Sequence, residues 1–590
     1  MTLKLFGVLP AIIMLVGAGV LSGCGKTKAA AANPSRGITE TALLKADPME
    51  IASPIAISAD FRHLALCLRR EGQDAVWFDG KLGKAYPTIK WLCFSRDEQH
   101  VLYQACTKTQ QSVVCDGNEG PWFERMGDLD AINMEPYSRD GVHTAYVAQK
   151  GKQQVAVIDG VVGPAFDYIT RPMGSIKEYT SLIISPDGTR TGYIGVRGKQ
   201  QCVVIDGKQG PWFDEVSLEP PMRDRNACPL FTADGKHTAY AANRGTKAFV
   251  VIDGVVKERR PGAFYDIYRS PDGSSIAYYD GEHLVINGKK FGPIYNCTSD
   301  GPTFSPDGSR FAIEEGSDVF GDGWKVAVDG KAGKDYQRVS SITFSPDSKH
   351  IAYFGQRNGA WYLVKDGTES PISGEGDQLA FSPDGAHFAY ACRAGKGQQS
   401  QLVVDDKKSP LVNGRILNVQ YSPDSAHVAA VVDSPGKACV ILDTTPGPIY
   451  QSVSPSVDFS ADGKHTLYLA TKSEKVTPPK PPSGKTPAPT TVTRSCVVVD
   501  GVEGPGFDLV QAAWLSPDGK HVAASVRQNG KWQVVVDGKS LLSYDTPSRE
   551  AYHAVEVYNK LNFDKQGILH AYGFRGGTLY HAMIDVSKVK

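Results

Sequence analysis

Short apolar runs alternate with turn signals along almost the whole chain. Around Ser382, an apolar run at 378–381 precedes the sequence Ser-Pro-Asp-Gly, a second run follows at 387–391, and a third at 402–404 ends at Asp405. Proline presets φ of the second turn residue and glycine accepts positive φ, so Ser-Pro-Asp-Gly predicts a tight turn. Runs this short between turns are typical of strands rather than helices.

This unit recurs from one end of the chain to the other, mostly at spacings of 35 to 48 residues. A fourth run follows a Gly-Pro turn, as at 210–216. Four short strands in about forty residues describe one blade of a β-propeller. A degenerate thirteenth copy lies at 563–567, and the other copies begin at Ser58, Ser95, Ser138, Ser185, Thr232, Ser270, Ser305, Ser345, Ser382, Ser422, Ser460 and Ser516.

We therefore predict an all-β protein of tandem β-propellers with about 13 four-stranded blades. Propellers typically have four to eight blades, so this number predicts two rings, one of six and one of seven. The expected N-terminal propeller spans 46–303 and the C-terminal one 304–590. The last repeat ends soon after its third run, at 579–585. We expect segment 51–57 to supply its fourth strand, because closure removes exposed sheet edges.

The pattern Ser-Pro-Asp-Gly-x-x-x-Ala-Tyr, as at 382–390, resembles the WD40-like repeat called PD40 of TolB-like β-propellers. The same repeat occurs in the propeller domains of prolyl-oligopeptidase-like and tricorn-like proteases. The resemblance covers about 50 to 590 and implies the propeller fold. Here the third run ends in Val-Val-Asp-Gly or a close variant, followed by Gly-Pro-x-Phe/Tyr, a form similar to a subgroup of bacterial lipoproteins. A TolB-like role in envelope integrity would be an analogy from fold.

The first 24 residues have the features of a secretory signal. Lys4 provides a positive charge, 11–20 is an apolar run, and Leu21-Ser22-Gly23-Cys24 matches a lipobox. The alternatives are a plain signal peptide or a membrane anchor, for which the apolar run is short.

The resemblance to bacterial lipoprotein signals implies removal of residues 1–23 and lipidation of Cys24. Gly25, rather than Asp, follows the Cys, which in Gram-negative relatives implies the outer membrane. Residues 24–45 are predicted to be the lipidated Cys and a flexible tether. The expected location is the bacterial cell envelope, with the chain anchored to the membrane at Cys24, on the periplasmic or the surface side.

Charge and cysteine content narrow the choice of partners. The numbers of Lys plus Arg and of Asp plus Glu are equal, 64 each, so no net charge attracts nucleic acid, and nucleic acid is not expected as a partner.

Ten cysteines remain beside Cys24, and the absence of Cys-x-x-Cys argues against a zinc ribbon. Most are expected to be buried thiols. Cys106 and Cys115 flank one hairpin and would form a disulfide if the compartment oxidised them.

Nine of the thirteen histidines lie five residues after the turn Ser, one to a repeat. One explanation is a ring of metal ligands. We favour a structural role, in which each His bonds the turn backbone or the turn Asp, because adjacent blades are too far apart to share an ion. No metal and no cofactor are therefore expected. The histidines are His63, His100, His143, His237, His350, His387, His427, His465 and His521, and examples of the Asp are Asp187, Asp307, Asp347, Asp384, Asp424 and Asp518.

Two tryptophans are candidates for a binding surface. In the Gly-Pro-x-aromatic turn the aromatic residue recurs, whereas the residue before it varies and is Trp at 122 and 212. Neighbouring strand residues face opposite sides. If the recurring aromatic packs inside, Trp122 and Trp212 are either exposed for binding or buried between blades.

A Pro-rich insertion at 471–494 interrupts one blade between its second and third strands. Such sequence favours extended polyproline II and cannot form a core. It is either an exposed recognition or glycan-bearing loop or a tolerated surface insertion. Shorter insertions at 171–180 and 217–229 allow the same two interpretations.

No catalytic motif stands out. Gly-x-Ser-x-Gly and His-Glu-x-x-His are absent, and Asp318 to Gly323 lacks the ligands of a calcium loop. We therefore predict no enzyme, but a membrane-anchored envelope lipoprotein whose WD40-like propellers bind a protein, peptide or glycan. The alternative is a glycan lyase or hydrolase with its site at a propeller channel mouth.

Overall fold

The computed structural model describes residues 37–45, 51–58, 62–95, 97–126, 143–169, 182–216, 229–259, 267–294, 301–316, 323–394, 399–476, 490–545 and 561–589. These residues form thirteen antiparallel sheets of four strand positions each. One short 3-10 turn, η5 (Val586–Lys588), follows the last strand. None of the helical structure in these ranges is long and apolar enough to cross a membrane.

We number the blades in chain order and give the strands of each from the inside of the ring outward. Blades 1 to 4 are β2 (Ile51–Ile57), β3 (Leu64–Arg70), β4 (Gln73–Phe78) and β5 (Lys81–Tyr86); β6 (Thr88–Phe94), β7 (Val101–Cys106), β8 (Gln111–Cys115) and β9 (Asn118–Glu119); β10 (Arg125–Met126), β11 (Ala145–Lys150), β12 (Gln153–Ile158) and β13 (Val161–Phe166); β14 (Ile183–Ile184), β15 (Thr191–Arg197), β16 (Gln200–Ile205) and β17 (Lys208–Phe213).

Blades 5 to 8 follow the same order, and the first strand position of blade 5 is split into two pieces. They are β18 (Glu215–Val216) with β19 (Leu230–Phe231), β20 (Thr238–Arg244), β21 (Lys247–Ile252) and β22 (Val255–Arg259); β23 (Ile267–Arg269), β24 (Ile276–Tyr279), β25 (Leu284–Ile286) and β26 (Lys289–Phe291); β27 (Thr303–Phe304), β28 (Phe311–Gly316), β29 (Trp324–Val328) and β30 (Lys331–Tyr336); β31 (Arg338–Phe344), β32 (Ile351–Arg357), β33 (Ala360–Lys365) and β34 (Thr368–Ile372).

Blades 9 to 12 include two further split positions, the outer one of blade 9 and the inner one of blade 11. They are β35 (Gly374–Phe381), β36 (Phe388–Ala394), β37 (Gln399–Val404) and β38 (Lys407–Lys408) with β39 (Val412–Asn413); β40 (Arg415–Tyr421), β41 (Val428–Asp433), β42 (Cys439–Leu442) and β43 (Thr445–Pro446); β44 (Ser452–Val453) with β45 (Asp458–Phe459), β46 (Thr466–Val476), β47 (Thr490–Val499) and β48 (Val502–Glu503); β49 (Leu509–Leu515), β50 (Val522–Gln528), β51 (Lys531–Val536) and β52 (Lys539–Tyr544).

Blade 13 is built from both ends of the chain. Its inner three strands are β53 (Leu561–Phe563), β54 (Ile568–Arg575) and β55 (Thr578–Asp585), and its outer strand is β1 (Ile38–Lys45). The β1–β55 ladder runs antiparallel from the pair Ile38 and Ile584 to the pair Lys45 and Thr578.

The local sequence explains the regularity of the blades. The Asp-Gly sequence after the third strand forms a two-residue hairpin turn in which both residues have positive φ, as at Asp116 (49°) and Gly117 (81°). The second and third strands read as continuous apolar runs and are buried along most of their length, as in β7. Each blade packs against a neighbour on both faces, so these strands have no solvent-facing side.

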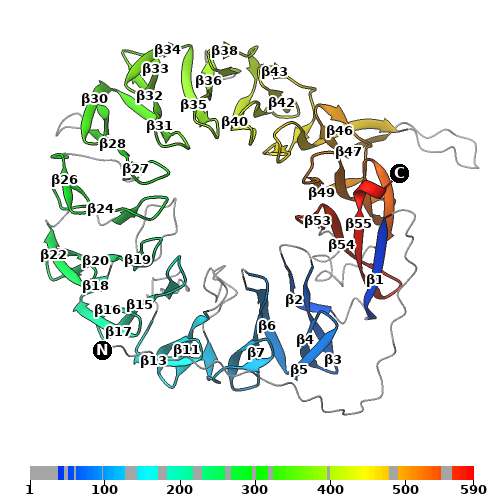
Figure 1. Cartoon of the computed structure of the whole chain (residues 1–590), viewed down its shortest axis with the longest axis horizontal. Helices are drawn as coiled ribbons and strands as arrows, with labels where there is room; N and C mark the ends of the chain where they lie inside the picture. Colours follow the sequence, from blue (N-terminus) through cyan, green and yellow to red (C-terminus); the bar gives the residue numbers. More distant parts are fainter. Residues whose placement is uncertain are drawn as a thin grey trace, which may run out of the picture.

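The thirteen blades form one ring, not two (Figure 1). At the expected boundary near residue 303, Tyr279 of blade 6 and Phe311 of blade 7 belong to one buried cluster. At the chain ends, Leu64 of blade 1 and Leu569 of blade 13 share another. The all-β prediction of thirteen four-stranded blades is confirmed, but the division into rings of six and seven is wrong. Ring size depends on the wedge angle between packed blades, which the number of repeats does not reveal.

The predicted closing strand is also wrong. Segment 51–57 is β2, the innermost strand of blade 1, and the closing strand is β1. Residues 38–45, expected to belong to a flexible tether, form this strand with Ile38 buried. The predicted lipidation residue Cys24 and the rest of that tether to residue 36 lie outside the described residues.

The Pro-rich insertion lies between the second and third strands of blade 11, as predicted. Its flanks are not polyproline, because β46 and β47 pair without a break from Leu467 and Val499 to Val476 and Thr490. Figure 1 shows this hairpin extending outward from the ring. Residues 477–489 lie outside the described residues, as do the insertions at 171–180 and 217–228 and most of the calcium-like segment, 317–322.

Candidate binding surfaces

A polar clasp recurs at one end of the blades, and blade 9 shows its geometry. The Oγ of buried Ser382 donates to Asp384 Oδ1 at 2.5 Å and accepts from the backbone N–H of His387 at 2.9 Å. His387 Nδ1 lies 2.6 Å from Asp405 Oδ2, and Asp405 Oδ1 accepts the backbone N–H of Phe388 at 3.0 Å. The clasp therefore ties the first turn of the blade to its outer hairpin.

All nine histidines make this contact with an Asp, but their predicted partner is wrong. Each lies beside the Asp of the Asp-Gly-type outer turn, whereas in those blades whose first turn the structure describes in full the Asp of that turn bonds its own Ser or Thr. Each pair lies within a single blade, at 2.5 to 3.2 Å. The pairs are His63–Asp79, His100–Asp116, His143–Asp159, His237–Asp253, His350–Asp366, His387–Asp405, His427–Asp443, His465–Asp500 and His521–Asp537.

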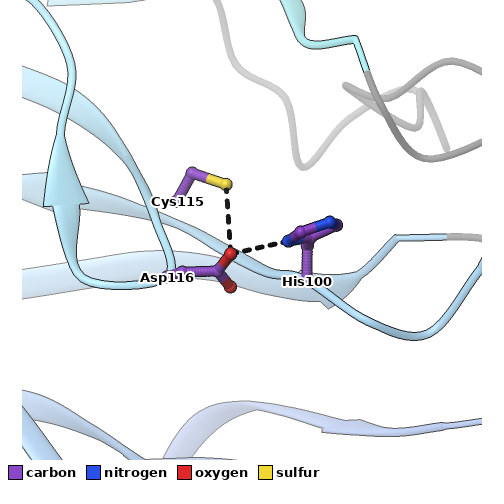
Figure 2. Close-up of side chains that lie close together, drawn as sticks. All are labelled: His100, Cys115 and Asp116. Atoms are coloured by element: carbon purple, nitrogen blue, oxygen red, sulfur yellow. Dashed lines mark hydrogen bonds and ion pairs between the residues drawn. The ribbon is translucent and has the colours of Figure 1, made fainter. Parts of the chain in front are cut away.

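Blade 2 adds a thiol to this clasp. His100, Cys115 and Asp116 each offer one ligand atom, and the three atoms lie within 4.8 Å of one another. Figure 2 shows His100 and Cys115 both directed toward the Asp116 carboxylate. In the described residues this is the one group of at least three His, Cys, Asp or Glu side chains close enough to hold a metal ion. The sequence analysis missed it, although a Cys next to the recurrent Asp was visible.

The disulfide suggested for the same hairpin does not form between Cys106 and Cys115. In the β7–β8 ladder Cys106 lies opposite Gln111 and Cys115 opposite Leu102, at different levels of the hairpin. Leu102 and Cys106 are four residues apart on β7, so the levels of the two cysteines differ by about 13 Å along the strands. This separation is beyond the reach of one disulfide.

Trp122 and Trp212 are half-buried between neighbouring blades. The Trp212 ring lies 6.3 Å from that of Phe166 in blade 3, with the Arg197 guanidinium 5.6 Å from its centre. The next residue, Phe213, is buried on the opposite side against Tyr240 of blade 5. The predicted alternation of facing is confirmed. Trp122 likewise packs on the cluster between blades 1 and 2, 6.3 Å from Tyr86.

Strongly exposed valines occupy one recurrent position on the outermost strands of three blades. Val161 of β13 and Val502 of β48 are each 71% exposed, and Val255 of β22 is 58% exposed. Each is the first residue after the Asp-Gly turn. In six other blades this position is Lys, namely Lys81, Lys208, Lys289, Lys331, Lys407 and Lys539. We call Val161, Val255 and Val502 the rim valines.

A pocket of about 420 Å³ lies between blades 4 and 5. Arg190, Lys208 and Lys236 contribute positive charge to its lining, and Asp206 and Asp253 contribute negative charge. Arg190 Nε donates to Asp206 Oδ2 at 2.9 Å, so part of this charge is neutralised within the wall. Because Trp212 faces blade 3 instead, the pocket and this predicted binding residue do not form one site.

A chain of polar contacts leads from Arg62 at the surface of the seam between blades 13 and 1 to the buried side chains of Asp564 and His570. Arg62 of blade 1 donates to Asp564 Oδ2 at 2.8 Å, and His570 Nε2 lies 3.3 Å from the same oxygen. The other ring nitrogen of His570 lies 2.9 Å from His581 Nε2. Burial, together with a smaller contribution from neighbouring His570, lowers the pKa of His581 to about 4. Burial alone would raise the pKa of Asp564, but hydrogen bonds from Arg62 and backbone N–H groups lower it.

Comparison with known proteins supports the fold only. No family model and no curated protein matches the chain. Similar solved structures include a eukaryotic initiation factor (13% identity, 59% of this chain and 93% of that chain, TM-score 0.28) and hydrazine synthase from Kuenenia stuttgartiensis (14%, 48% and 95%, 0.21). A third is the β-propeller domain of Cps50 (Swd1) from Myceliophteria thermophila (13%, 50% and 98%, 0.20).

The thirteen four-stranded blades arranged in a ring show the β-propeller fold of the chain by themselves. With identities below 15% and TM-scores below 0.3, none of these structures bears on what this chain binds.

Proposed function

We propose that this protein is a non-catalytic binding scaffold that holds a protein, peptide or glycan partner at the bacterial cell envelope. The rim valines carry the proposal. Their exposed side chains occupy a position where six of the other blades have Lys, so blade stability does not require an apolar residue there. An exposed apolar side chain beside an open strand edge offers an apolar contact to a partner, and such contacts favour a protein or peptide over a glycan.

The partner is expected to contact the outer edge of the ring. The rim valines belong to the outermost strands of blades 3, 5 and 11, which no neighbouring strand covers on the outer side. An apolar surface on the partner would pack on these valines, and the open strand edges could add backbone hydrogen bonds.

Membrane attachment is a separate part of the proposal. It rests on the lipobox ending at Cys24 and on the similarity to bacterial lipoprotein signals, and it places the protein at the outer membrane through a lipid at Cys24. Replacing Cys24 by Ser should move the protein from the membrane fraction to the soluble fraction. Retention of the variant in the membrane fraction would contradict a lipid anchor.

The binding function is tested by cross-linking residues 25–590 to envelope extract and identifying bound species by mass spectrometry. A matched variant, Val161→Lys with Val255→Lys and Val502→Lys, gives the three blades the residue that six others already have. We expect one stoichiometric partner with the unaltered chain, and at least tenfold less with the variant at unchanged thermal stability. Equal capture by both proteins would refute binding through the rim valines.

A further inference from the structure

We propose that blade 2 contains a transition-metal site formed by His100, Cys115 and Asp116, with Zn²⁺ as the expected ion. His100 lies at the start of β7, whereas Cys115 ends β8 and Asp116 follows it in the hairpin turn. The β7–β8 pairing brings the three side chains to one end of the blade (Figure 2).

The distances suit one small ion. His100 Nδ1 lies 2.6 Å and Cys115 Sγ 3.9 Å from Asp116 Oδ2, and all three ligand atoms fit within 4.8 Å. On a tetrahedral Zn²⁺ with bonds of about 2.0 to 2.3 Å, ligand atoms lie about 3.5 Å apart. Side-chain rotation alone can open the nitrogen–oxygen distance and shorten the sulfur–oxygen distance to that value.

The types of the three ligand atoms indicate which metal ion the site prefers. A thiolate and an imidazole favour Zn²⁺ or another late transition metal over Ca²⁺ and Mg²⁺, which prefer oxygen ligands. Three protein ligands leave a fourth position for water or a group from another molecule, the arrangement of open zinc sites. The side chains of His100 and Asp116 are 42% and 39% exposed, so an ion can reach the site from solvent.

Metal binding need not disrupt the clasp. Asp116 Oδ1 accepts the backbone N–H of Val101 at 2.9 Å, and this bond can remain while Oδ2 binds the ion. The thiol proton of Cys115 and a proton on His100 Nδ1 pass to solvent as the metal–ligand bonds form. Affinity should therefore rise with pH.

The other blades show that the thiol is an addition to the scaffold. Nine blades have the His–Asp pair, but the residue before the Asp is a Cys only in blade 2. At the equivalent positions stand Phe78, Ile158, Ile205, Ile252, Ile286, Val328, Lys365, Val404, Leu442, Val499 and Val536. The clasp therefore forms without a thiol, and Cys115 is not required for this blade geometry.

The first test is titration of the reduced protein, residues 25–590, which lack Cys24, with Co²⁺ as a spectroscopic substitute for Zn²⁺. We expect one equivalent to bind with a thiolate-to-cobalt charge-transfer band and tetrahedral d–d bands, and Zn²⁺ to displace it. Cys115→Val, which gives blade 2 the residue of blade 11, should abolish the charge-transfer band with unchanged thermal unfolding. His100→Ala should weaken Co²⁺ binding at least tenfold.

The second test builds the same triad elsewhere. In blade 11, His465 Nδ1 lies 2.8 Å from Asp500 Oδ2, and the Asp-Gly turn has the same backbone conformation as in blade 2. Val499→Cys should add a second Co²⁺ equivalent with the same absorption band. The proposal is overturned if the unaltered protein gives no charge-transfer band, or if the band survives Cys115→Val and so belongs to other thiols. If Val499→Cys adds no equivalent, these three side chains do not suffice, which also contradicts the proposal.

Discussion

Blade 13 differs from the twelve blades before it in the contacts of its first turn and in the origin of its outer strand. In blade 9 the turn Asp384 bonds Ser382 within its own blade. In blade 13 Asp564 stands in the place of that Ser, and it accepts a hydrogen bond from Arg62 of blade 1. The twelve blades are each one continuous stretch of chain, whereas blade 13 takes its outer strand from residues 38–45.

Closure brings together segments from the two ends of the chain. Glu40 on β1 accepts two hydrogen bonds from Arg575, at 2.9 and 3.0 Å, and one from Tyr544 of blade 12. Tyr336 and Arg357 make the same contacts with Glu369 between blades 7 and 8. The ring therefore closes through a contact that also occurs inside it, here made by segments far apart in sequence, to which the pair of Arg62 and Asp564 is added. Four changes, from the largest expected effect to the smallest, test this contrast.

Removal of β1 should have the largest effect. A chain lacking residues 1–45 should lose several kcal/mol of unfolding free energy, because a buried strand edge, Ile38 and the Glu40–Arg575 pair are lost together. Thermal unfolding and the hydrodynamic radius measure the result. A synthetic peptide of residues 37–45 should restore both, and a scrambled peptide should not. Unchanged stability after the deletion would contradict closure by β1.

Acid should loosen the seam before the rest of the ring. The pKa of His581 is about 4 in the folded protein against 6.5 for an ordinary His, so only the unfolded chain takes up this proton between those values. The free energy of unfolding should be steady above pH 6.5 and fall toward pH 4, by at most about 3 kcal/mol. Denaturant titrations at several pH values measure it. His581→Gln should flatten this part of the profile, and an unaltered slope would assign the effect to other groups.

Loss of the ion pair across the seam should have an intermediate effect. Arg62→Ala leaves the buried Asp564 carboxylate without a charged donor, and we expect a loss of about 1 to 2 kcal/mol. Lys464→Ala is the control, because the pair of Lys464 and Asp462 lies within one blade and is exposed, and it should cost less than about 0.5 kcal/mol. Equal losses in the two variants would show that the seam pair has no special role.

The smallest effect should come from one repeated clasp. Ser382→Ala removes a buried hydroxyl with two hydrogen bonds, and we expect about 1 kcal/mol. Amide hydrogen exchange should show faster exchange in blade 9 and no change in blade 13. Faster exchange at the seam would mean that blades and seam are coupled around the ring.

The sequence was sufficient to predict the structural features that recur from blade to blade. Ser-Pro-Asp-Gly turns, Asp-Gly hairpins and short apolar runs are local signals, and they predicted the blades and the facing of Trp212 and Phe213. The partner of each His was missed because its Asp belongs to a different turn, mostly 16 residues away, and both turns contain an Asp. Recurrence shows that a residue is structural but does not show which of two equivalent carboxylates it contacts.

Structural features that occur only once among the described residues were harder to predict from the sequence. Residues 38–45 show no strict alternation of polar and apolar side chains, and they stand apart from the repeats beside a Pro- and Ala-containing stretch, so the sequence favours a tether there. The His570–His581 contact depends on adjacent strands of the one degenerate repeat. The group at His100 and Cys115 requires the β7–β8 register, and in the sequence Cys115 suggested a disulfide instead.

The contacts between the two ends of the chain also determine when the ring can close during synthesis. Glu40 and Arg575 are separated by 535 positions, and Arg62 and Asp564 by 502. The ribosome therefore makes β1 before any blade and its partner β55 after all the others, so this first strand must stay unpaired while twelve blades form. Ring closure is a late, long-range step that depends on translation reaching the last residues. A transcript truncated just before residue 578 would release a chain with nearly every blade complete and no means of joining its ends.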